Sequence, residues 1–215
     1  RFQGKCTSIT ELSHRLAASR CAIMGNGALA CWGSNETGAV SPARQPSIEL
    51  LPVPVTKAEG VPELGQVTAV CAGQEHTCAL NEAGEIYCWG DFGPKESAGE
   101  EAGNQEAEVF SLVLPEAAKH VVCGRSFACA LTVDREVWCW GDSSEGTLGV
   151  GIDAGFVAKP EHPIPGLKDV KHLSCGADYC CALLEGGGVS CWGRIELDHG
   201  NNSFLGGPPS ILPSG

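Results

Sequence analysis

Cysteine is the residue whose type and spacing most clearly predict chemistry in this sequence. The 215-residue chain holds 13 cysteines. At this density they suggest metal binding or redox chemistry in a reducing compartment, and disulfides in an oxidising one. Eight of them fall into four pairs with ten-residue spacing: Cys21 and Cys31, Cys78 and Cys88, Cys129 and Cys139, and Cys181 and Cys191. Because zinc ligand pairs are usually separated by only about two to four residues, the regular pairs favour disulfides and an oxidising compartment.

A β-hairpin is the element that would bring each pair together. Residues 76–90 show it most clearly, because two short apolar runs flank a turn that contains Gly84. If Ala83 is the centre of that turn, Cys78 lies directly opposite Cys88. Opposed residues of antiparallel strands have Cα atoms about 4.5–5.5 Å apart, which overlaps the about 4.4–6.8 Å that a disulfide needs. The spacing therefore predicts a hairpin crosslinked across its own strands.

The hairpin recurs four times, and each copy ends in a Trp-Gly pair. The pairs are Trp32-Gly33, Trp89-Gly90, Trp140-Gly141 and Trp192-Gly193. The tryptophans are 57, 51 and 52 residues apart, a period typical of repeat architectures, in which no unit can bury its apolar face alone. Because they recur with the period, we expect these pairs to lie in the core between repeats rather than to line a carbohydrate site.

The period divides the chain into a short stub and four repeats. The stub is residues 1–8, and the repeats are residues 9–60, 61–119, 120–168 and 169–215. About four short strands in about 50 residues suit one blade of an all-β propeller. The proline-rich segment 50–55 is expected at or near a sheet edge, because proline lacks the backbone N–H that a central strand needs.

Composition and charge exclude several classes of function. A net charge of −12 argues against a nucleic-acid partner, because phosphate binding relies on clustered Lys and Arg. No apolar run is long enough for membrane insertion. The sequence has no nucleophile elbow, phosphate loop or metalloprotease motif, so we assign no catalytic residue, cofactor or metal and predict a protein that is not an enzyme.

Two further motifs accompany the hairpins. Residues 72–76 read Ala-Gly-Gln-Glu-His, and residues 146–149 read Gly-Thr-Leu-Gly. With the Cys-Ala-Leu…Cys-Trp-Gly hairpins, they resemble the regulator of chromosome condensation repeat family, in the disulfide-bearing form found in secreted or surface proteins, chiefly bacterial ones. The resemblance implies a propeller, usually of seven blades, so the remaining blades are expected to be missing from this chain. It also implies guanine-nucleotide exchange on a small GTPase as an alternative function.

Five cysteines fall outside the regular pairs: Cys6, Cys71, Cys123, Cys175 and Cys180. Cys71, Cys123 and Cys175 hold matching positions on the opening strands of successive repeats. Face-packed sheets lie about 10 Å apart, so these three are not expected to bond to one another and are interpreted as small buried apolar side chains. A local disulfide between Cys175 and Cys180, which flank a four-residue turn, is the open alternative.

Other residues that could do chemistry are better explained by structure. His76 is replaced by Ser19, Phe127 and Tyr179 in the other repeats, so we expect it to pack or bond locally rather than act as a base. Asp142, Glu145 and Asp153 could bind calcium, but Gly-Asp-Ser is a common turn sequence, and we favour the turn. Asn35 and Asn201 begin glycosylation patterns, which matter only in a eukaryotic secretory route.

The segments after each Trp-Gly pair are the predicted binding surface. They are residues 34–46, 91–108, 142–156 and 194–207. They leave the same end of their repeats and differ most between them, as binding loops do. The second segment carries Glu96, Glu100, Glu101, Glu106 and Glu108, so we predict a partner with a basic patch. The predicted protein is a secreted or cell-surface module, bacterial in origin, that binds a protein or glycan; a structural spacer is the third alternative.

Overall fold

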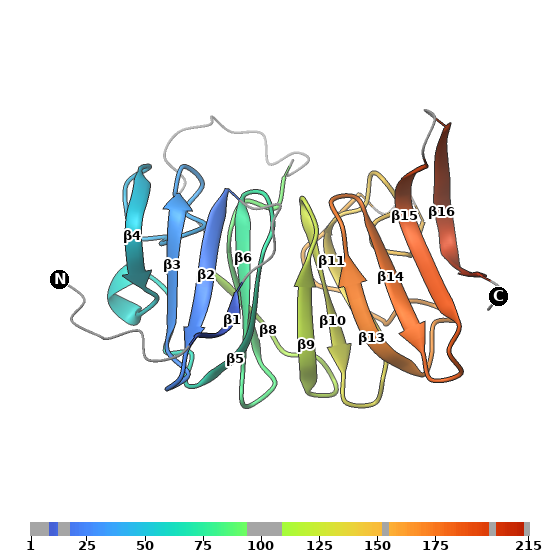
Figure 1. The fold of residues 1–215 in the computed structure, drawn as a ribbon, viewed down its shortest axis with the longest axis horizontal. Helices are drawn as coiled ribbons and strands as arrows, with labels where there is room; N and C mark the ends of the chain where they lie inside the picture. The colour runs from blue at the N-terminus through green and yellow to red at the C-terminus, as the bar shows by residue number, and fades with distance from the viewer. Residues whose placement is uncertain (1–8, 13–17, 94–108, 152–154, 198–200, 213–215) are drawn as a thin grey trace. The chain divides into compact units, whose positions relative to one another are not determined.

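The computed structural model of the protein describes residues 9–12, 18–93, 109–151, 155–197 and 201–212 (Figure 1). These residues form four antiparallel sheets of four strands each, so the expected all-β propeller blades are confirmed. Their one helical element is a 3-10 helix at Lys57–Glu59. Within the described ranges, no helix has the length and apolar character needed to cross a membrane.

Each repeat supplies one sheet, whose strands are adjacent in chain order. Blade 1 contains β1 (Ile9–Leu12), β2 (Ser19–Met24), β3 (Leu29–Ser34) and β4 (Ile48–Pro54). Blade 2 contains β5 (Val67–Ala72), β6 (His76–Asn81), β7 (Ile86–Gly90) and β8 (Phe110–Leu112). Blade 3 contains β9 (Ala118–Cys123), β10 (Phe127–Thr132), β11 (Val137–Asp142) and β12 (Phe156–Val157). Blade 4 contains β13 (Val170–Cys175), β14 (Tyr179–Leu184), β15 (Val189–Leu197) and β16 (Asn201–Leu212).

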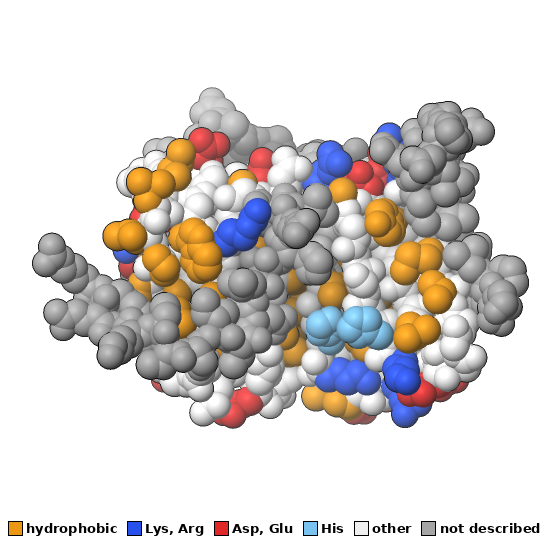
Figure 2. Space-filling view, in the orientation of Figure 1, with side chains coloured by type: hydrophobic (Ala, Val, Ile, Leu, Met, Phe, Trp, Pro, Cys, Tyr) orange, Lys and Arg blue, Asp and Glu red, His pale blue; other side chains and the backbone are white. Residues whose placement is uncertain are grey.

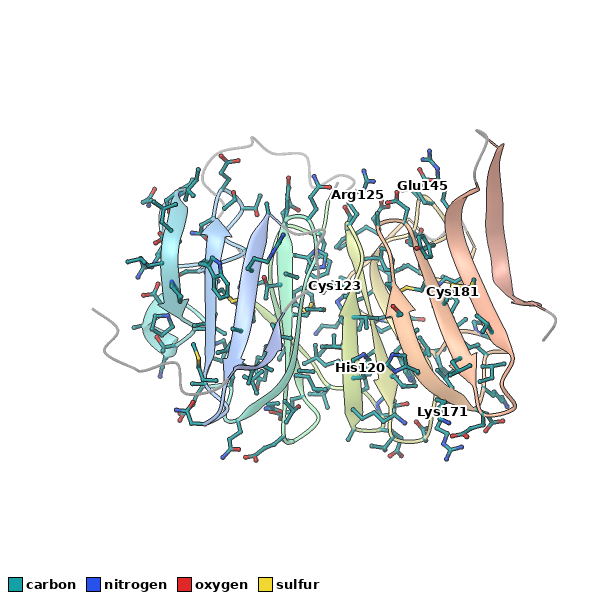
Figure 3. The ribbon with its side chains drawn as sticks, in the orientation of Figure 1. His120, Cys123, Arg125, Glu145, Lys171 and Cys181 are labelled. Carbon is teal, nitrogen blue, oxygen red and sulfur yellow. A yellow bond between two sulfur atoms is a disulfide. The ribbon has the colours of Figure 1, made fainter. Side chains whose placement is uncertain are left out.

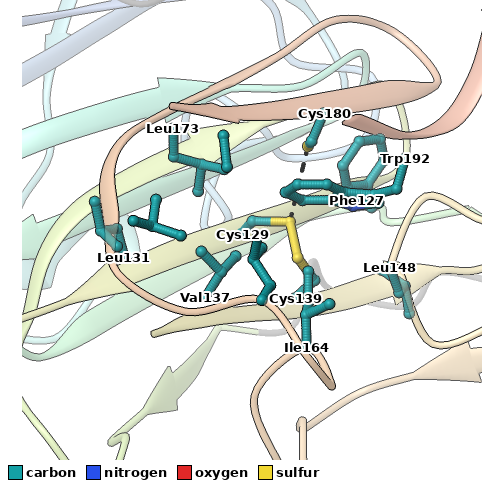
Figure 4. Packing of buried hydrophobic residues seen from close by; sticks show 13 residues of the cluster. Phe127, Cys129, Leu131, Val137, Cys139, Leu148, Ile164, Leu173, Cys180 and Trp192 are labelled. Atoms are coloured by element: carbon teal, nitrogen blue, oxygen red, sulfur yellow. Dashed lines mark hydrogen bonds between the residues drawn. A yellow bond between two sulfur atoms is a disulfide. The ribbon is translucent and has the colours of Figure 1, made fainter. Parts of the chain in front are cut away.

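The blades form two compact units. Blades 1 and 2 make unit 1, and blades 3 and 4 make unit 2. In unit 1 the apolar faces of β2 and β3 pack on β5, β6 and β7, with Ile23, Leu29, Val70 and Trp89 buried between them. In unit 2 Phe127, Leu131 and Val137 of blade 3 pack against Leu173, Ala182 and Trp192 of blade 4 (Figure 4). Each core therefore lies between two successive repeats, as the period predicts.

The Trp-Gly pair has the same backbone geometry in every blade. Its glycine has a positive φ, between 94° and 110°. A Cβ at any of these four glycines would lie less than 3.0 Å from a backbone carbonyl oxygen in the turn before the neighbouring strand. That carbonyl accepts a hydrogen bond from the residue after the glycine, as in Asp142 N–H to Ser126 O at 3.0 Å. Glycine is thus required where β11 passes the turn before β10, and equivalently in the other three blades.

Trp89, Trp140 and Trp192 are fully buried, whereas Trp32 of blade 1 is half-buried. The indole N–H of Trp89 donates to the Ala39 carbonyl at 2.8 Å, and that of Trp192 to the Thr147 carbonyl at 2.8 Å. Both acceptors lie in the segment after the preceding Trp-Gly pair. Each of these two tryptophans therefore fixes the loop of the blade before it.

One face of blade 4 is much more exposed than the same face of blade 3. Tyr179, Leu183 and Val189 are 37–38% exposed, whereas their counterparts Phe127, Leu131 and Val137 are at most 2% exposed. Figure 2 shows apolar side chains gathered over β14 and β15. In blade 3 this face is covered by blade 4.

The prediction of a fourth loop at residues 194–207 is wrong. β15 continues to Leu197, and β16 begins at Asn201 and pairs with it from Leu197↔Asn201 to Gly193↔Leu205. The apolar residues Ile195 and Leu197 alternate with polar Arg194 and Glu196, which is the two-residue period of a strand. The expectation of a variable loop overlooked that alternation.

Candidate binding site at the loop end of the blades

The structure joins the four regularly spaced cysteine pairs as disulfides across their hairpins. Cys78 lies directly opposite Cys88 in the β6–β7 register, and the other three pairs are opposed in the same way. Their Cα atoms are 4.0–4.1 Å apart. The crosslinks thus fix the register of the two central strands in every blade.

The remaining described cysteines are also disulfide-bonded. Cys175 pairs with Cys180 across the turn between β13 and β14, with Cα atoms 4.0 Å apart. Cys71 and Cys123 are in the disulfide-bonded state too, so the expectation that they are simple buried thiols is wrong. On the opening strands β9 and β13, the rings of His120 and His172 stack with centroids 5.7 Å apart. Cys6 lies outside the described residues.

The other candidates from the sequence have structural roles. His76 is fully buried. The carboxylate of Asp142 accepts hydrogen bonds from Ser144 N–H at 3.0 Å and Ser144 O–H at 2.7 Å. Asn35 is 1% exposed, and its side chain bonds the backbone of Val40 and Ser41 at 2.8–3.0 Å. A glycan on Asn35 is therefore incompatible with this fold, while Asp153 and the side chain of Asn201 lie outside what is described.

A pocket of about 290 Å³ lies at the loop end of unit 2, between blades 3 and 4. We use "loop end" for the end of each blade where the post-Trp-Gly segment begins. The pocket is lined by the turn before β10, the segment after Trp140-Gly141, the turn before β14 and the first residue after Trp192-Gly193. Figure 3 labels Arg125 and Glu145 at this end of unit 2, with Lys171 at the opposite end. The lining residues are Arg125, Ser126, Phe127, Asp142, Ser144, Glu145, Thr147, Asp178 and Arg194.

Ion pairs between the two blades hold the pocket's charged groups in place. Arg125 forms a bidentate ion pair with Asp178, with Nε–Oδ1 and Nη2–Oδ2 distances of 3.1 Å. This geometry fixes both side chains. Arg194 contacts Glu145 with an Nη1–Oε1 distance of 3.3 Å. Thr147 links the pocket wall to the core, because its carbonyl accepts the Trp192 indole N–H. The lining therefore holds two guanidinium groups and three carboxylates.

Sequence reasoning found only part of this site. Asp142 and Glu145 lie in a segment predicted to bind, and Arg194 in another. Arg125 and Asp178 were missed, although they occupy the two variable positions after the glycine of the Gly-x-x-His motif. Those positions form the turn that lies beside the glycine of the Trp-Gly pair. Their place in the repeat was therefore the feature that could have indicated these two residues. The five glutamates of residues 96–108 lie outside the described residues.

In unit 1 the segment after Trp32-Gly33 is held by an ion pair with Glu59. Arg44 contacts both Glu59 carboxylate oxygens, at 2.6 Å and 2.9 Å, and Ser41 donates to the same carboxylate at 2.6 Å. The hydrogen bond from Arg44 is the main reason that the pKa of Glu59 is lowered. The segment after Trp32-Gly33 is thereby tied to the 3-10 helix.

The His120–His172 pair predicts acid sensitivity in unit 2. Burial, and then the charge of His172, lower the pKa of His120. The unfolded state therefore takes up the proton first, at about pH 6.5, and stability falls as the pH drops below that value. We expect His120→Gln to lose less stability than the wild type between pH 7.5 and pH 5, measured by urea unfolding. His162→Gln, at an exposed position, is the control; equal losses in wild type and His120→Gln would contradict the assignment.

Comparisons with known proteins agree on one family of repeat proteins. Sequence profiles described as regulator of chromosome condensation (RCC1) repeats match residues 67–93 and 118–147, and residues 134–183. The chain is 33% identical over 152 residues to the mitochondrial RCC1 domain-containing protein RUG3 of Arabidopsis thaliana, which covers 66% of this chain and 32% of that protein. It is 27% identical over 217 residues to the secretion-regulating guanine nucleotide exchange factor of Bos taurus, covering 86% of this chain and 43% of that protein.

The fold matches solved structures of the same kind. Prp20p from Saccharomyces cerevisiae, described with its binding properties to Gsp1p and histones, superposes with a TM-score of 0.71 at 20% identity. The match covers 96% of this chain and 50% of that one, so the chain spans half or less of each of these three proteins. The chain belongs to the regulator of chromosome condensation repeat family, in a form whose hairpins carry disulfides.

Proposed function

We propose that the chain is a non-enzymatic propeller module that binds a protein partner with a basic patch at the loop end of its blades. The observation that carries this proposal is the pocket between blades 3 and 4, where carboxylates outnumber guanidinium groups. Two post-Trp-Gly segments, the part of the repeat that differs most between copies, contribute to its lining, and the second repeat has five glutamates in its own post-Trp-Gly segment. A charge pattern of this kind steers a basic partner and contributes to specificity.

We also propose a secreted or cell-surface location. The crosslinks support it, because disulfides persist mainly in oxidising compartments. Crosslinks in every hairpin suit a chain whose four-stranded blades each bury only a small core. A glycan partner is the other outcome of the binding test, and it would show as binding that does not depend on the carboxylates.

The proposal predicts that charge at the loop end controls binding. One variant changes Glu145→Gln and Asp178→Asn, and a second changes the five glutamates of residues 96–108 to Ser. Partners captured from the native extracellular milieu should bind both variants at least about tenfold more weakly at low salt, since exposed charges act strongly there. The control is Glu82→Gln with Glu116→Gln, two exposed carboxylates at the opposite end of blade 2. Equal capture by all variants would show that the charges at the loop end do not contribute to binding.

Guanine-nucleotide exchange is the second candidate. It rests on the relative named as an exchange factor, of which this chain covers 43%. Its test is nucleotide release from a small GTPase, followed with a fluorescent GDP analogue. Release accelerated by this chain, and lost in the Glu145→Gln, Asp178→Asn variant, would favour exchange over simple partner binding.

A further inference from the structure

Four sulfur atoms from two blades meet in the core of unit 2. The disulfide Cys129–Cys139 belongs to the hairpin of blade 3, and Cys175–Cys180 joins β13 to β14 in blade 4. The Sγ atoms of Cys129 and Cys180 lie 3.9 Å apart (Figure 4), and those of Cys129, Cys175 and Cys180 are all within 4.8 Å of one another. Two disulfides are therefore in contact across the blade interface.

Blade 4 is the only repeat with a cysteine at this position. Cys180 precedes the first hairpin cysteine, where the other repeats have Arg20, Thr77 and Ala128. The residue at this position faces the preceding blade: Thr77 donates to the Ala39 carbonyl at 2.8 Å. The repeat geometry thus aims Cys180 at the hairpin disulfide of blade 3.

Access to the four sulfurs is unequal. Cys129 and Cys180 are 0% exposed and Cys139 is 6% exposed, whereas Cys175 is half-buried. Thiol–disulfide exchange requires access to the sulfur that is attacked. A dithiol reductant would therefore attack Cys175, and the leaving group would be the Cys180 thiolate, already beside Cys129.

We propose that this cluster is a disulfide-exchange switch that crosslinks blades 3 and 4 when the Cys175–Cys180 bond is reduced. The dithiol attacks Cys175 Sγ, and its second thiol then releases Cys175 as a thiol, so the dithiol is oxidised and the protein gains two electrons and two protons. The Cys180 thiolate attacks Cys129 Sγ. A Cys129–Cys180 bond forms, the Cys129–Cys139 bond breaks, and Cys139 leaves as a thiolate that takes up a proton.

The product holds the same number of disulfides as direct reduction of Cys175–Cys180 would leave. It differs in position: the crosslink now joins β10 to β14, and the thiols are at Cys175 and Cys139. The sulfur atoms must approach from 3.9 Å to the disulfide length of about 2.05 Å. The switch converts a crosslink within blade 3 into one between blades.

Peptide mapping separates the two outcomes cleanly, because trypsin cuts after Arg125, Arg135, Lys168, Lys171 and Arg194. The intact chain is treated with limiting dithiothreitol, quenched in acid and denaturant, and blocked with N-ethylmaleimide. The starting protein links peptide 126–135 to peptide 136–168. Exchange instead links 126–135 to 172–194, with the blocking group on Cys139 and Cys175. Blocked Cys175 and Cys180 with the Cys129–Cys139 link intact would overturn the proposal.

A variant removes the need for reductant. In Cys175→Ala, Cys180 has no partner of its own, so the same exchange should place the blocking group on Cys139 in a major fraction of molecules. The matched control is the Cys78–Cys88 disulfide in the same samples, because Thr77 stands where Cys180 stands. A variant blocked only at Cys180 would contradict the proposal even if the reduced wild type unfolds.

Discussion

Gly141→Val is expected to destabilise the protein by roughly 3 kcal/mol. Gly141 has a φ of 110°, a conformation that β-branched residues adopt only under strain. A Cβ there would lie 2.5 Å from the Ser126 carbonyl oxygen and 2.6 Å from the Phe127 Cα. That carbonyl is also the acceptor for Asp142 N–H, so relief of the clash would break the turn that lines the pocket.

Gly166→Val is the matched control for backbone strain alone. Gly166 has a φ of 77°, and a Cβ there would meet nothing within 4 Å. Its cost is expected to be about 1 kcal/mol. Urea unfolding followed by tryptophan fluorescence compares the two variants. Similar losses at both positions would show that the close approach of the two backbones at Gly141 contributes nothing.

The exposed face of blade 4 is expected to make the isolated chain self-associate. Tyr179, Leu183 and Val189 form an apolar surface of the kind that blade 4 itself covers in blade 3. Contiguous exposed apolar surface of this kind promotes association. Sedimentation velocity at tens of micromolar should show a dimer or larger species, and Tyr179→Thr, Leu183→Thr, Val189→Thr together should give a monomer.

A second apolar patch provides the control for this prediction. Ile48, Leu50 and Leu51 of β4 are 68%, 85% and 77% exposed, on the edge strand of blade 1. Changing these three to Thr should leave the association unchanged. A monomeric wild-type chain, or association that depends on β4 instead, would contradict the role assigned to the blade 4 face.

The hairpins could be predicted from sequence because their information is local. Ten-residue spacing and a central glycine turn are enough to place Cys78 opposite Cys88, and the register confirms it. Burial of Trp89, Trp140 and Trp192 between repeats was also predictable, since it follows the period, whereas Trp32 is half-buried. The need for glycine in each Trp-Gly pair could not be predicted, because it depends on a carbonyl from the turn before the neighbouring strand.

The candidate site was harder to predict because it joins two repeats. Arg125 and Asp178 are 53 residues apart, and neither belongs to a motif with a chemical signature. The disulfide-bonded states of Cys71 and Cys123 were also missed, because neither cysteine belongs to a regularly spaced pair.

The account rests on hairpins that are oxidised in the native compartment, and disulfide mapping of the natural protein tests this most directly. Cells or medium are treated with N-ethylmaleimide before lysis, and the purified chain is digested without reduction. The account predicts Cys21–Cys31, Cys78–Cys88, Cys129–Cys139 and Cys181–Cys191 as crosslinked peptides. N-ethylmaleimide found on all eight cysteines would show that they were free thiols in the cell. That result would contradict both the crosslinked blades and the proposed extracellular location.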